Sequence, residues 1–360
     1  MTAMEKKDKN LNVPNLRFPE FSGEWERCMI GDVLKVGNGK DYKHLAEGDI
    51  PVFGTGGYML SVNDFLYDGD SVFIGRKGTI NKPFFYSGKF WTVDTLFYTH
   101  SFNKVIPHFV YGLFQRVNWN NYNEASGVPS LSKSTIEKIP IAIPSIEEQQ
   151  KISSLLSLLD QRIETQKKII EKYESLIRGL YQFLFQQAKY DHFVSLGDIS
   201  QISNGNSDVK DASMYNDGSL YPFFDRSDEI KFLPEYLFDK EAIIYPGEGA
   251  EFYPRYYNGK FALHQRCYAV YDISTDFIPR YLYHYCKTQN SYFVRNAVGS
   301  TVASLRLDTF KRLKIPAIPT HHQESLVMFL DKIEAKIECN RTILKKYEEQ
   351  KKYLLFTLFI

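Results

Sequence analysis

Residues 143–152 read IPSIEEQQKI, and they mark a point at which a strand gives way to a helix. The apolar run KIPIAIP that leads into them ends in Pro144, and a proline disfavours helical backbone in the residue before it. Residues 318–326, IPTHHQESL, repeat the arrangement near the other end of the chain. Ser145 with Glu148, and Thr320 with Gln323, have the spacing of a capping box, which predicts that a helix begins at each junction.

The repetition extends well beyond the junction and keeps its order along the chain. The offset between matching residues drifts only from 166, between Ile30 and Leu196, to 174, between Tyr173 and Tyr347. A period of this length is too long for a solenoid, so the chain is two copies of one module, each a globular part followed by a long helix. The matching segments are IGDVLKVGNGK (30–40) with LGDISQISNGN (196–206), IPVF (50–53) with YPFF (221–224), GKFWTVD (88–94) with GKFALHQ (259–265), VIPHFVYGLF (105–114) with FIPRYLYHYC (277–286), and EKYESLIRGLYQFLF (171–185) with KKYEEQKKYLLFTLF (345–359).

Each globular part combines strand and helix patterns. DSVFIG (70–75) and EAIIYPG (241–247) predict strands that run into glycine turns. IPHFVYGLFQRV (106–117) and IPRYLYHYC (278–286) have apolar residues at helical spacing and a proline in the first turn. The globular parts are therefore predicted to be mixed α/β (α+β) domains.

Both predicted long helices carry apolar residues alternately four and three positions apart, which is the spacing of a coiled-coil seam. Each seam is interrupted by an amide at an equivalent place. One amphipathic helix lying on its own domain is the alternative, but a helix of roughly 60 Å, at 1.5 Å per residue, is longer than a small domain. The predicted seam residues are Ile152, Leu156, Leu159, Ile163, Gln166, Ile170, Tyr173 and Ile177 in the first helix and Leu330, Ile333, Ile337, Asn340, Leu344 and Tyr347 in the second.

The order of the segments determines how the two helices would pair. The first helix ends close to the second globular part, and the second helix begins directly after it, so the two can pack only in antiparallel fashion. The predicted molecule is two globular heads held apart by a two-helix rod, with pseudo-two-fold symmetry. We expect Gln166 and Asn340 to meet and to fix the register, the best-attested role of a buried seam amide.

The composition of the 360 residues suits two domains and an intracellular setting. The net charge of +1 gives no general attraction to nucleic acid, so any basic patch must be local. The four cysteines, Cys28, Cys267, Cys286 and Cys339, have no metal or disulfide spacing and are expected to be reduced thiols. We find no signal region and no run of roughly 18 apolar residues, and we expect a cytoplasmic protein.

The whole arrangement resembles the specificity (S) subunit of Type I restriction–modification enzymes. The most specific element is the junction IPIAIPSIEEQQKISSLLSLLD (139–160), which is similar to the segment that follows each target-recognition domain in that family. The opening LRFPEFSGEWERCMIGDVLKVGNGK (16–40) is also similar to that family. The predicted domains are a disordered N-terminus at 1–15, the first target-recognition domain at 16–144, the first long helix at 145–187, the second target-recognition domain at 188–319 and the second long helix at 320–360.

The resemblance implies a division of labour with other subunits. Each head would read one half of a split, asymmetric double-stranded DNA site, and the coiled coil would set the spacing between the halves. Two methyltransferase subunits, which bind S-adenosylmethionine and methylate adenine, would dock on the rod, and motor-nuclease subunits would join for restriction. The chain itself would hold no cofactor and would catalyse nothing.

The residues themselves give no competing active site. FGTGG (53–57) is a lone glycine cluster, and neither an Asn-Pro-Pro-Tyr-like methyltransferase motif nor a Walker loop occurs in the sequence. His321 and His322 are adjacent and lack the spaced partners of a metal site, which favours a role as solvated residues near the start of the second helix. No pair of carboxylates can be assigned a catalytic role from its spacing.

Clusters of basic, amide and small polar residues in the heads are the candidate DNA contacts. For any single member an ordinary surface role competes with DNA contact, so the clusters matter more than their members. In the first head the candidates are Lys40, Lys43, Arg76, Lys77, Thr79, Asn81, Lys82, Ser126, Gly127, Ser130, Ser132 and Lys133. In the second head they are Arg255, Tyr256, Tyr257, Lys260, His264, Gln265, Arg266, Ser300, Thr301, Ser304 and Arg306.

Two other functions remain as alternatives. A coiled-coil scaffold with protein-binding heads fits the repeat and the rod equally well, although divergent basic and aromatic loops favour DNA. A stand-alone methyltransferase is disfavoured by the missing cofactor motif.

Overall fold

The computed structural model describes residues 12–187 and 190–360. The chain divides into two compact units: unit 1 combines Met1–Lys167 with Thr342–Ile360, and unit 2 is Lys168–Arg341. Each unit holds one head and one end of each of two long helices, α4 (Ile146–Tyr181) and α9 (Thr320–Thr357). The duplication predicted from the repeat is therefore present, and each long helix contributes to both units.

The N-terminal segment joins unit 1 from Asn12 onward. The prediction that residues 1–15 are disordered falls mostly on residues 1–11, which lie outside the described residues. Asn12 is buried, and its side-chain amide donates a hydrogen bond to the Trp25 carbonyl oxygen at 2.5 Å. The Leu16 N–H donates to the Thr357 carbonyl oxygen at the end of α9. These bonds attach residues 12–16 to unit 1.

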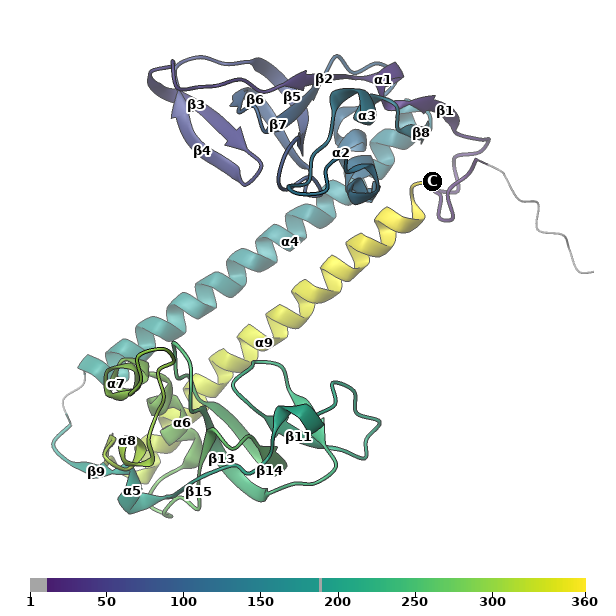
Figure 1. Cartoon of the computed structure of the whole chain (residues 1–360). Helices are drawn as coiled ribbons and strands as arrows, with labels where there is room; N and C mark the ends of the chain where they lie inside the picture. Colours follow the sequence, from purple (N-terminus) through teal and green to yellow (C-terminus); the bar gives the residue numbers. More distant parts are fainter. Residues whose placement is uncertain (1–11, 188–189) are drawn as a thin grey trace, which may run out of the picture. The chain divides into compact units, whose positions relative to one another are not determined.

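A six-stranded sheet forms the centre of each head (Figure 1). In unit 1 its strands are β2 (Lys35–Asn38), β3 (Glu47–Gly54), β4 (Gly57–Val62), β5 (Tyr67–Gly75), β6 (Phe84–Thr92) and β7 (Leu96–His100). In unit 2 they are β10 (Gln201–Asn204), β11 (Tyr221–Phe224), β12 (Lys231–Leu233), β13 (Phe238–Pro246), β14 (Arg255–Leu263) and β15 (Cys267–Tyr271). The orders β2-β7-β5-β6-β3-β4 and β10-β15-β13-β14-β11-β12 are the same order of equivalent strands. Neighbours are antiparallel, except that β3 and β6, like β11 and β14, run parallel.

A helix covers one face of each sheet, and it begins at a proline as predicted. α2 (Pro107–Arg116) packs on β5 and β6, and its equivalent α6 (Pro279–Lys287) packs on β13 and β14. The buried residues Phe109, Val110 and Leu113 of α2 share one core with Ile152 and Leu156 of α4. The head and the long helix of unit 1 are therefore one hydrophobic structure rather than two separate ones.

Short elements connect these larger parts. Two small antiparallel sheets pair β1 (Glu26–Met29) with β8 (Pro140–Ile143) and β9 (Phe193–Ser195) with β16 (Lys314–Pro316). The short helices are α1 (Ile30–Val33), α3 (Lys133–Glu137), α5 (Leu196–Ile199), α7 (Asn290–Asn296) and α8 (Leu307–Lys311), with 3-10 turns at Trp119–Tyr122 and Val209–Asp211 and a π-helical segment at Gln182–Gln187 after α4.

The glycine that both copies place directly after β2 and β10 has a steric cause. A Cβ atom on Gly39 would lie 1.9 Å from the Val93 carbonyl oxygen, and one on Gly205 would lie 1.9 Å from the Leu263 carbonyl oxygen. No side chain fits such an approach of backbone to backbone. The glycine therefore keeps the ends of β2 and β10 close to the equivalent turns of their sheets.

The junction between head and long helix differs from the predicted capping box. The Glu148 N–H does reach the Ser145 hydroxyl at 3.4 Å, but the Glu148 side chain bonds Arg17 and Trp25 instead of turning back to the start of the helix. Gln323 likewise does not serve as the second half of a box with Thr320. Its side chain bonds the head of unit 2, because the buried amide has backbone partners there.

Gln149 and Gln323 are the equivalent residues of the two junctions, and both are fully buried. The Gln149 side-chain oxygen accepts the Ile106 N–H at 3.0 Å, and its NH₂ group donates to the carbonyl oxygens of Lys104 and Pro144. Gln323 makes the same three bonds to Ile278 N–H and to the carbonyl oxygens of Asp276 and Ile318. Each glutamine thus ties the start of the head helix to the start of a long helix.

Within each unit the two long helices run antiparallel. In unit 1, Lys351 of α9 pairs with Asp160 of α4 at 2.5 Å, and Glu348 pairs with Lys167 at 3.9 Å, so residue numbers rise along one helix as they fall along the other. In unit 2, the Arg341 guanidinium bonds Glu174 at 2.7 Å and the Tyr181 hydroxyl bonds Glu334 at 3.2 Å, which gives the same direction. The predicted antiparallel pairing is therefore confirmed in each unit.

Most of the predicted seam is shielded from solvent. Ile152, Leu156, Leu159, Ile163, Gln166, Ile170, Ile177, Leu330, Ile333 and Ile337 are buried, and Tyr173, Asn340, Leu344 and Tyr347 are half-buried. Gln166 and Asn340 belong to different units, so their pairing stays a prediction. Among residues 12–187 and 190–360, no helix is long and apolar enough to span a membrane.

Candidate nucleic-acid interface

In unit 1, three segments that are distant in sequence meet beside the end of β5. The Arg76 and Lys77 N–H groups both donate to the Thr95 carbonyl oxygen in the turn between β6 and β7, at 2.8 and 3.2 Å. From the loop before α3, Leu131 N–H donates to the Arg76 carbonyl oxygen, and Ser130 forms a β-bridge with Lys77. The structure thus brings together five predicted DNA contacts around a hollow of about 670 Å³: Arg76, Lys77, Ser130, Ser132 and Lys133.

Unit 2 builds the same arrangement from equivalent backbone positions. Leu305 N–H donates to the Gly247 carbonyl oxygen at 2.8 Å, as Leu131 does to Arg76, and Ser304 forms a β-bridge with Glu248, as Ser130 does with Lys77. The predicted contacts His264, Gln265 and Arg266 form the turn between β14 and β15 and line a hollow of about 290 Å³ together with Glu248. The three segments are the residues directly after β5 or β13, the turn between β6 and β7 or between β14 and β15, and the loop before α3 or α8. Together they are called the recognition edge of each head.

The two recognition edges share a backbone frame but differ in chemistry. Unit 1 has Arg76 and Lys77 where unit 2 has Gly247 and Glu248. Lys77 is exposed and forms no ion pair with any described residue, and Lys133 is half-exposed beside Glu137 at 3.7 Å. In unit 2, the Arg266 guanidinium is offset by Glu248, which it contacts at 2.9 and 3.0 Å. The edge of unit 1 is therefore cationic, whereas the edge of unit 2 is close to neutral.

Several predicted contacts are engaged inside the head of unit 2. The Arg255 guanidinium donates to the carbonyl oxygens of Asp225 and Ser227 and lies over the Phe224 ring, and burial lowers its pKa. The Tyr256 hydroxyl donates to Glu241. Tyr257 packs half-buried on the core of the sheet. These three side chains already have partners that hold the head together.

The remaining predicted contacts lie at or near the surface outside the two hollows. Lys40, Lys43, Thr79, Asn81, Lys82, Ser126 and Gly127 are exposed in unit 1, and Lys260, Ser300, Thr301 and Arg306 are exposed in unit 2. Lys260 lies on β14 with its amine 4.8 Å from the centre of the Tyr236 ring. Their exposure leaves them accessible to a partner but does not by itself assign one.

Arg226, Asp208 and Glu248 line the hollow of unit 2 and were missed by the sequence analysis. Arg226 is exposed and follows β11, the strand equivalent to β3. The signal that could have found it is the repeat itself, because YPFF matches IPVF and places Arg226 just past the end of an equivalent strand. No pattern in the sequence around Glu248 could have identified it, because its role depends on its contact with Arg266 in another segment.

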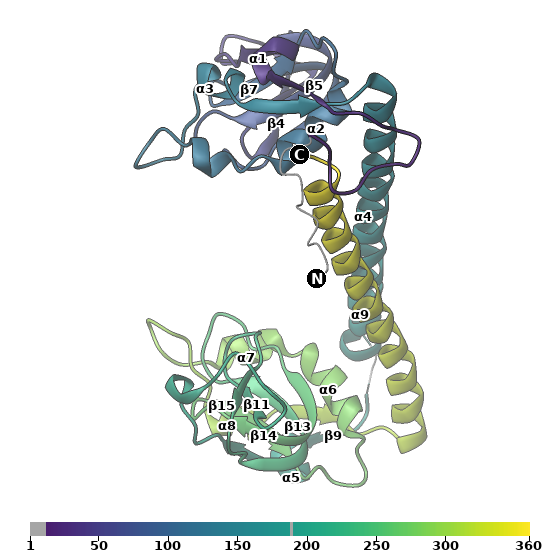
Figure 2. The same cartoon turned by 90° about the vertical axis from the view of Figure 1, so that its right-hand side faces the viewer.

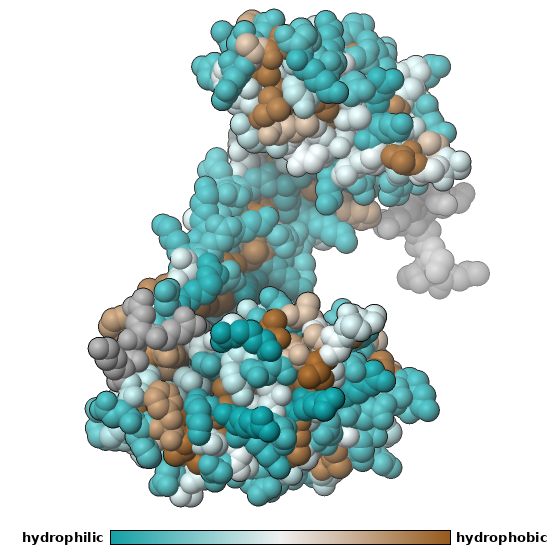
Figure 3. Space-filling model, turned by 60° about the vertical axis from the view of Figure 1, so that its left-hand side comes forward, coloured by the Kyte–Doolittle hydropathy of each residue, from teal (hydrophilic) through white to brown (hydrophobic). Residues whose placement is uncertain are grey.

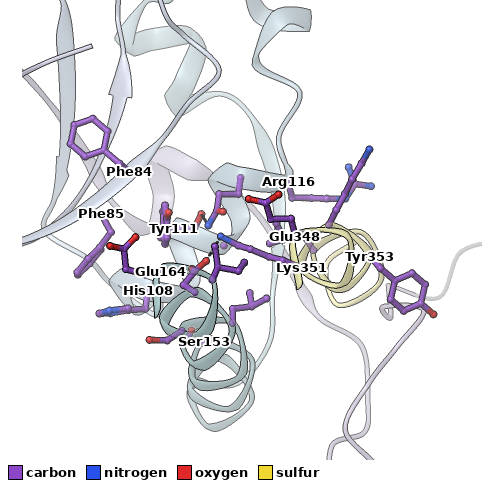
Figure 4. A pocket seen from close by; sticks show the side chains of 18 of the residues that line it. Phe84, Phe85, His108, Tyr111, Arg116, Ser153, Glu164, Glu348, Lys351 and Tyr353 are labelled. Atoms are coloured by element: carbon purple, nitrogen blue, oxygen red, sulfur yellow. Dashed lines mark hydrogen bonds and ion pairs between the residues drawn. The ribbon is translucent and has the colours of Figure 1, made fainter. Parts of the chain in front are cut away.

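A groove of about 1120 Å³ lies in unit 1 where α2 meets α4 and α9 (Figure 4). Phe85, Tyr111 and Phe356 contribute aromatic surface to it. Lys351 extends from α9 between the helices, and its amine lies 5.7 Å from the centre of the Tyr111 ring. Burial, and then the Asp160 carboxylate, raise the pKa of Tyr111 to about 12. The groove therefore combines aromatic and apolar surface with two ion pairs between α4 and α9, Lys351–Asp160 and Lys167–Glu348.

Two buried polar atoms in this groove have no hydrogen-bond partner among the described residues. The Ser153 side chain on α4 is 7% exposed and lines the groove, and its Oγ atom forms no hydrogen bond with any described residue. Buried polar groups in folded proteins are nearly always hydrogen-bonded. The Arg116 Nε atom, also lining the groove, is buried and unpartnered in the same way within the described chain.

Unit 2 has a groove of about 1030 Å³ at the equivalent place, between α6, α4 and α9. Its side chains already pair with one another: Arg280 bonds Asp331 and Glu334, Lys287 bonds Glu334, and His284 bonds Asp331 at 2.7 Å. Burial alone would raise the pKa of Glu334, but Lys287, His284 and Arg280 outweigh it and hold that pKa below its usual range. The second groove is therefore a network of paired charges.

His284, Asp331 and Glu334 have ligand atoms within 4.8 Å of one another, close enough to hold a metal ion. The two carboxylates are already neutralised by the Arg280 guanidinium and the Lys287 amine. The His284 ring also has partners on both sides, since the Tyr181 hydroxyl lies 2.9 Å from its other nitrogen. A metal would have to displace these cations, so the cluster is better explained as a junction between α6 and α9.

The fold and these sites together define a class of protein: two matched mixed α/β heads, each joined to an antiparallel helix pair. Comparison with known proteins gives the family. The model of the Type I restriction modification DNA specificity domain matches residues 22–175 and again residues 190–349. The chain belongs to the family of Type I restriction–modification specificity subunits, and the predicted fold class is confirmed.

Individual relatives agree with the family match. A putative type I restriction enzyme specificity subunit from Haemophilus influenzae is 23% identical over 318 residues, which cover 80% of each chain. The type I restriction enzyme MjaVIII specificity subunit from Methanocaldococcus jannaschii is 25% identical over 215 residues, 52% of this chain and only 47% of that protein. The crystal structure of an S subunit from M. genitalium has the same fold, with a TM-score of 0.74 at 15% identity over 97% of this chain and 99% of that one.

Proposed function

We propose that this chain recognises a bipartite DNA site, with each head reading one half. The observation that carries the proposal is the pair of recognition edges, which repeat one backbone frame and change the side chains on it. A constant frame with different Arg, Lys, Glu and Gln groups is what reading two different base sequences requires, because base edges are distinguished by their patterns of donors and acceptors. The long helices α4 and α9 would set the distance between the two halves.

We further propose that each groove docks one methyltransferase subunit. The grooves recur at equivalent positions of the two units, so two copies of one partner would meet each unit at the same place, although the second groove carries more paired charges. The apolar lining and the unpartnered Ser153 of the first groove support a protein partner, since both would gain from being covered. On the face that Figure 3 shows, the apolar patches are small and separated by hydrophilic side chains.

The chemistry would then belong to the partners. The methyltransferase subunits would bind S-adenosylmethionine and methylate an adenine in each half-site, and motor-nuclease subunits would join for restriction. This chain would contribute binding and spacing without a cofactor or a catalytic step. Family membership supports this division, since the matched relatives are named specificity subunits.

The test is methylation mapping. The chain is expressed with a methyltransferase subunit in a host that lacks DNA methylation, and modified adenines are read by single-molecule sequencing. The expected result is one split motif with a fixed gap between two unrelated half-sites. A stable complex that leaves every adenine unmodified would favour the alternative function, a scaffold whose heads bind proteins.

A further inference from the structure

The Arg266–Glu248 pair has a geometry that leaves half of the guanidinium available. Both contacts with the Glu248 carboxylate are made by one atom, Nη1, at 2.9 and 3.0 Å. The Nε and Nη2 groups of Arg266 form no hydrogen bond with any described residue. The Arg266 side chain is 63% exposed, whereas that of Glu248 is only 21% exposed. The less exposed Glu248 carboxylate thus holds the more exposed Arg266 guanidinium by Nη1, and the edge formed by Nε and Nη2 stays open to a ligand.

Glu248 is held in place from both sides. Its backbone forms a β-bridge with Ser304, and the Gly249 N–H donates to the Ala303 carbonyl oxygen at 3.0 Å. On the other side, a Cβ atom at Gly247 would lie 1.9 Å from the Arg266 carbonyl oxygen, so the segment and the turn touch backbone to backbone. The backbone of Glu248 is therefore fixed, and its carboxylate restrains the Arg266 guanidinium. This reduces the conformational entropy that the Arg266 side chain loses on binding.

We propose that Arg266 reads a guanine base in the half-site of the unit 2 head, and that Glu248 is its positioning residue. The proposal rests on the proposed function above. The Nε and Nη2 groups form a planar pair of donors, which matches the O6 and N7 acceptors that guanine presents in the major groove. Glu248 leaves this pair of donors unengaged because it uses only the remaining nitrogen.

A phosphate is a less suitable ligand for the same arginine. The charge of Arg266 is already offset by Glu248. The other charged groups of the hollow, Asp208, Asp225 and Arg226, are also close to balanced, because the Lys231 amine pairs with Asp225. A phosphate at this place would therefore meet no net positive charge, whereas the edge of a guanine base is neutral and needs none.

The repeat makes the proposal specific to one half-site. The equivalents of Arg266 and Glu248 in unit 1 are Thr95 and Lys77, which cannot form such a pair. A guanine read in this way belongs only to the half-site of unit 2. A change at Arg266 should therefore alter one base position in one half of the motif.

The experiment maps methylation by the complete complex, with the unaltered chain and its variants. R266A is expected to lower the preference for one guanine by roughly tenfold to a hundredfold. R266K should do the same, because lysine keeps the charge but loses the paired donors. E248A should relax the same position, E248Q should retain part of the preference, and the E248A/R266A double variant should relax no more than R266A. The control is R312A, which removes a guanidinium that is 78% exposed and paired with Asp308 on α8.

The outcomes separate the two proposals. If the unaltered chain gives no split motif, the proposed function fails before Arg266 is examined. If the unaltered chain gives a split motif but R266A leaves it unchanged, the inference is wrong while the function stands. A uniform loss of methylation at all sequences in R266A would assign the arginine to a phosphate, and it would also overturn the inference.

Discussion

Gln149 and Gln323 make equivalent hydrogen bonds in the two units, and both side chains are fully buried. Each amide uses its oxygen and its NH₂ group to bond three backbone groups, two in the head and one at the start of a long helix. Glutamine suits the site because its amide is both donor and acceptor. The sequence shows both residues but not their partners, since Ile106 and Ile278 lie 43 and 45 positions away.

Replacement of Gln149 by alanine should destabilise unit 1 strongly. The substitution leaves the Ile106 N–H and the carbonyl oxygens of Lys104 and Pro144 buried without partners, which should cost roughly 2–4 kcal/mol. Urea unfolding of the whole chain, followed by circular dichroism, measures the loss. Gln150→Ala is the matched control, because Gln150 is the next residue along the helix and its side chain is exposed. Equal stability of the two variants would contradict the role assigned to Gln149.

Arg76 and Lys133 should have different effects on DNA recognition. Arg76→Ala should relax discrimination at a single base position, by about 1–3 kcal/mol if its contact is bidentate. Lys133→Ala should weaken binding to all sequences and flatten the dependence on salt, as expected of a phosphate contact. Both effects are measured by binding of the complex to a library of duplexes at two salt concentrations. Unchanged affinity and unchanged sequence preference in both variants would show that this edge does not contact DNA.

His284 should make the stability of unit 2 depend on pH. Burial holds its pKa below the ordinary value of 6.5, although Glu334 and Asp331 act in the opposite direction. The unfolded chain therefore binds a proton more readily, and stability should fall as the pH drops below about 6.5 toward the folded pKa. The Tyr181 hydroxyl, 2.9 Å from a nitrogen of the ring, and the Arg280 guanidinium also act on His284, and Lys287 pairs with Glu334 beside it.

Chemical denaturation at pH values from 7.5 to 5.5, values chosen to bracket the ordinary histidine pKa of about 6.5, tests this dependence. His284→Gln should lower stability at neutral pH and should lose most of the slope across this range. The depressed pKa values of Asp331 and Glu334 act only at lower pH, so they do not account for a slope near neutrality. A variant that keeps the full slope would assign it to another group.

At the scale of elements, the parts determined by local pattern could be predicted and the parts determined by long-range pairing could not. The heptad spacing predicts the long helices, and DSVFIG and EAIIYPG lie in strands β5 and β13. Arg255 looks like a DNA contact in sequence but bonds carbonyl groups of its own head, because β14 brings it beside Asp225. The pairing of Arg266 with Glu248 could not be predicted for the same reason. It joins the turn between β14 and β15 to the segment after β13, and these are brought together only by the folded sheet.

Phe356→Glu should weaken docking of the methyltransferase subunit without disturbing the fold. Phe356 is 58% exposed and lines the groove of unit 1 beside Arg116, so the change places a charge on an apolar docking surface while the core is untouched. Co-purification of a tagged methyltransferase subunit measures the effect. Tyr58→Glu, at a 64% exposed position on β4, is the matched control. Equal recovery with both variants would remove the groove from the docking surface.

At the scale of the whole molecule, α4 and α9 each pass from one unit to the other, so their length should control the gap between the half-sites. Removal of one heptad from each helix, residues 164–170 and 338–344, preserves the seam and shortens each by about 10 Å. This length is about three base pairs of DNA. Methylation mapping should show the same two half-sites with a gap shorter by about three base pairs. An unchanged gap would mean that the helices do not set the spacing.

The division of the chain between units has a consequence for the order in which the protein can form during synthesis. Unit 2 is one continuous stretch, Lys168–Arg341, whereas unit 1 needs Thr342–Ile360 as well as the N-terminal part. The Phe359 ring packs 5.1 Å from Phe109 in the core of unit 1, and Figure 2 shows the C-terminal end of α9 beside α2. A ribosome makes those residues after the whole of unit 2, so the second head can mature while the first is still incomplete. A premature stop codon near residue 341 would therefore damage the head that was made first.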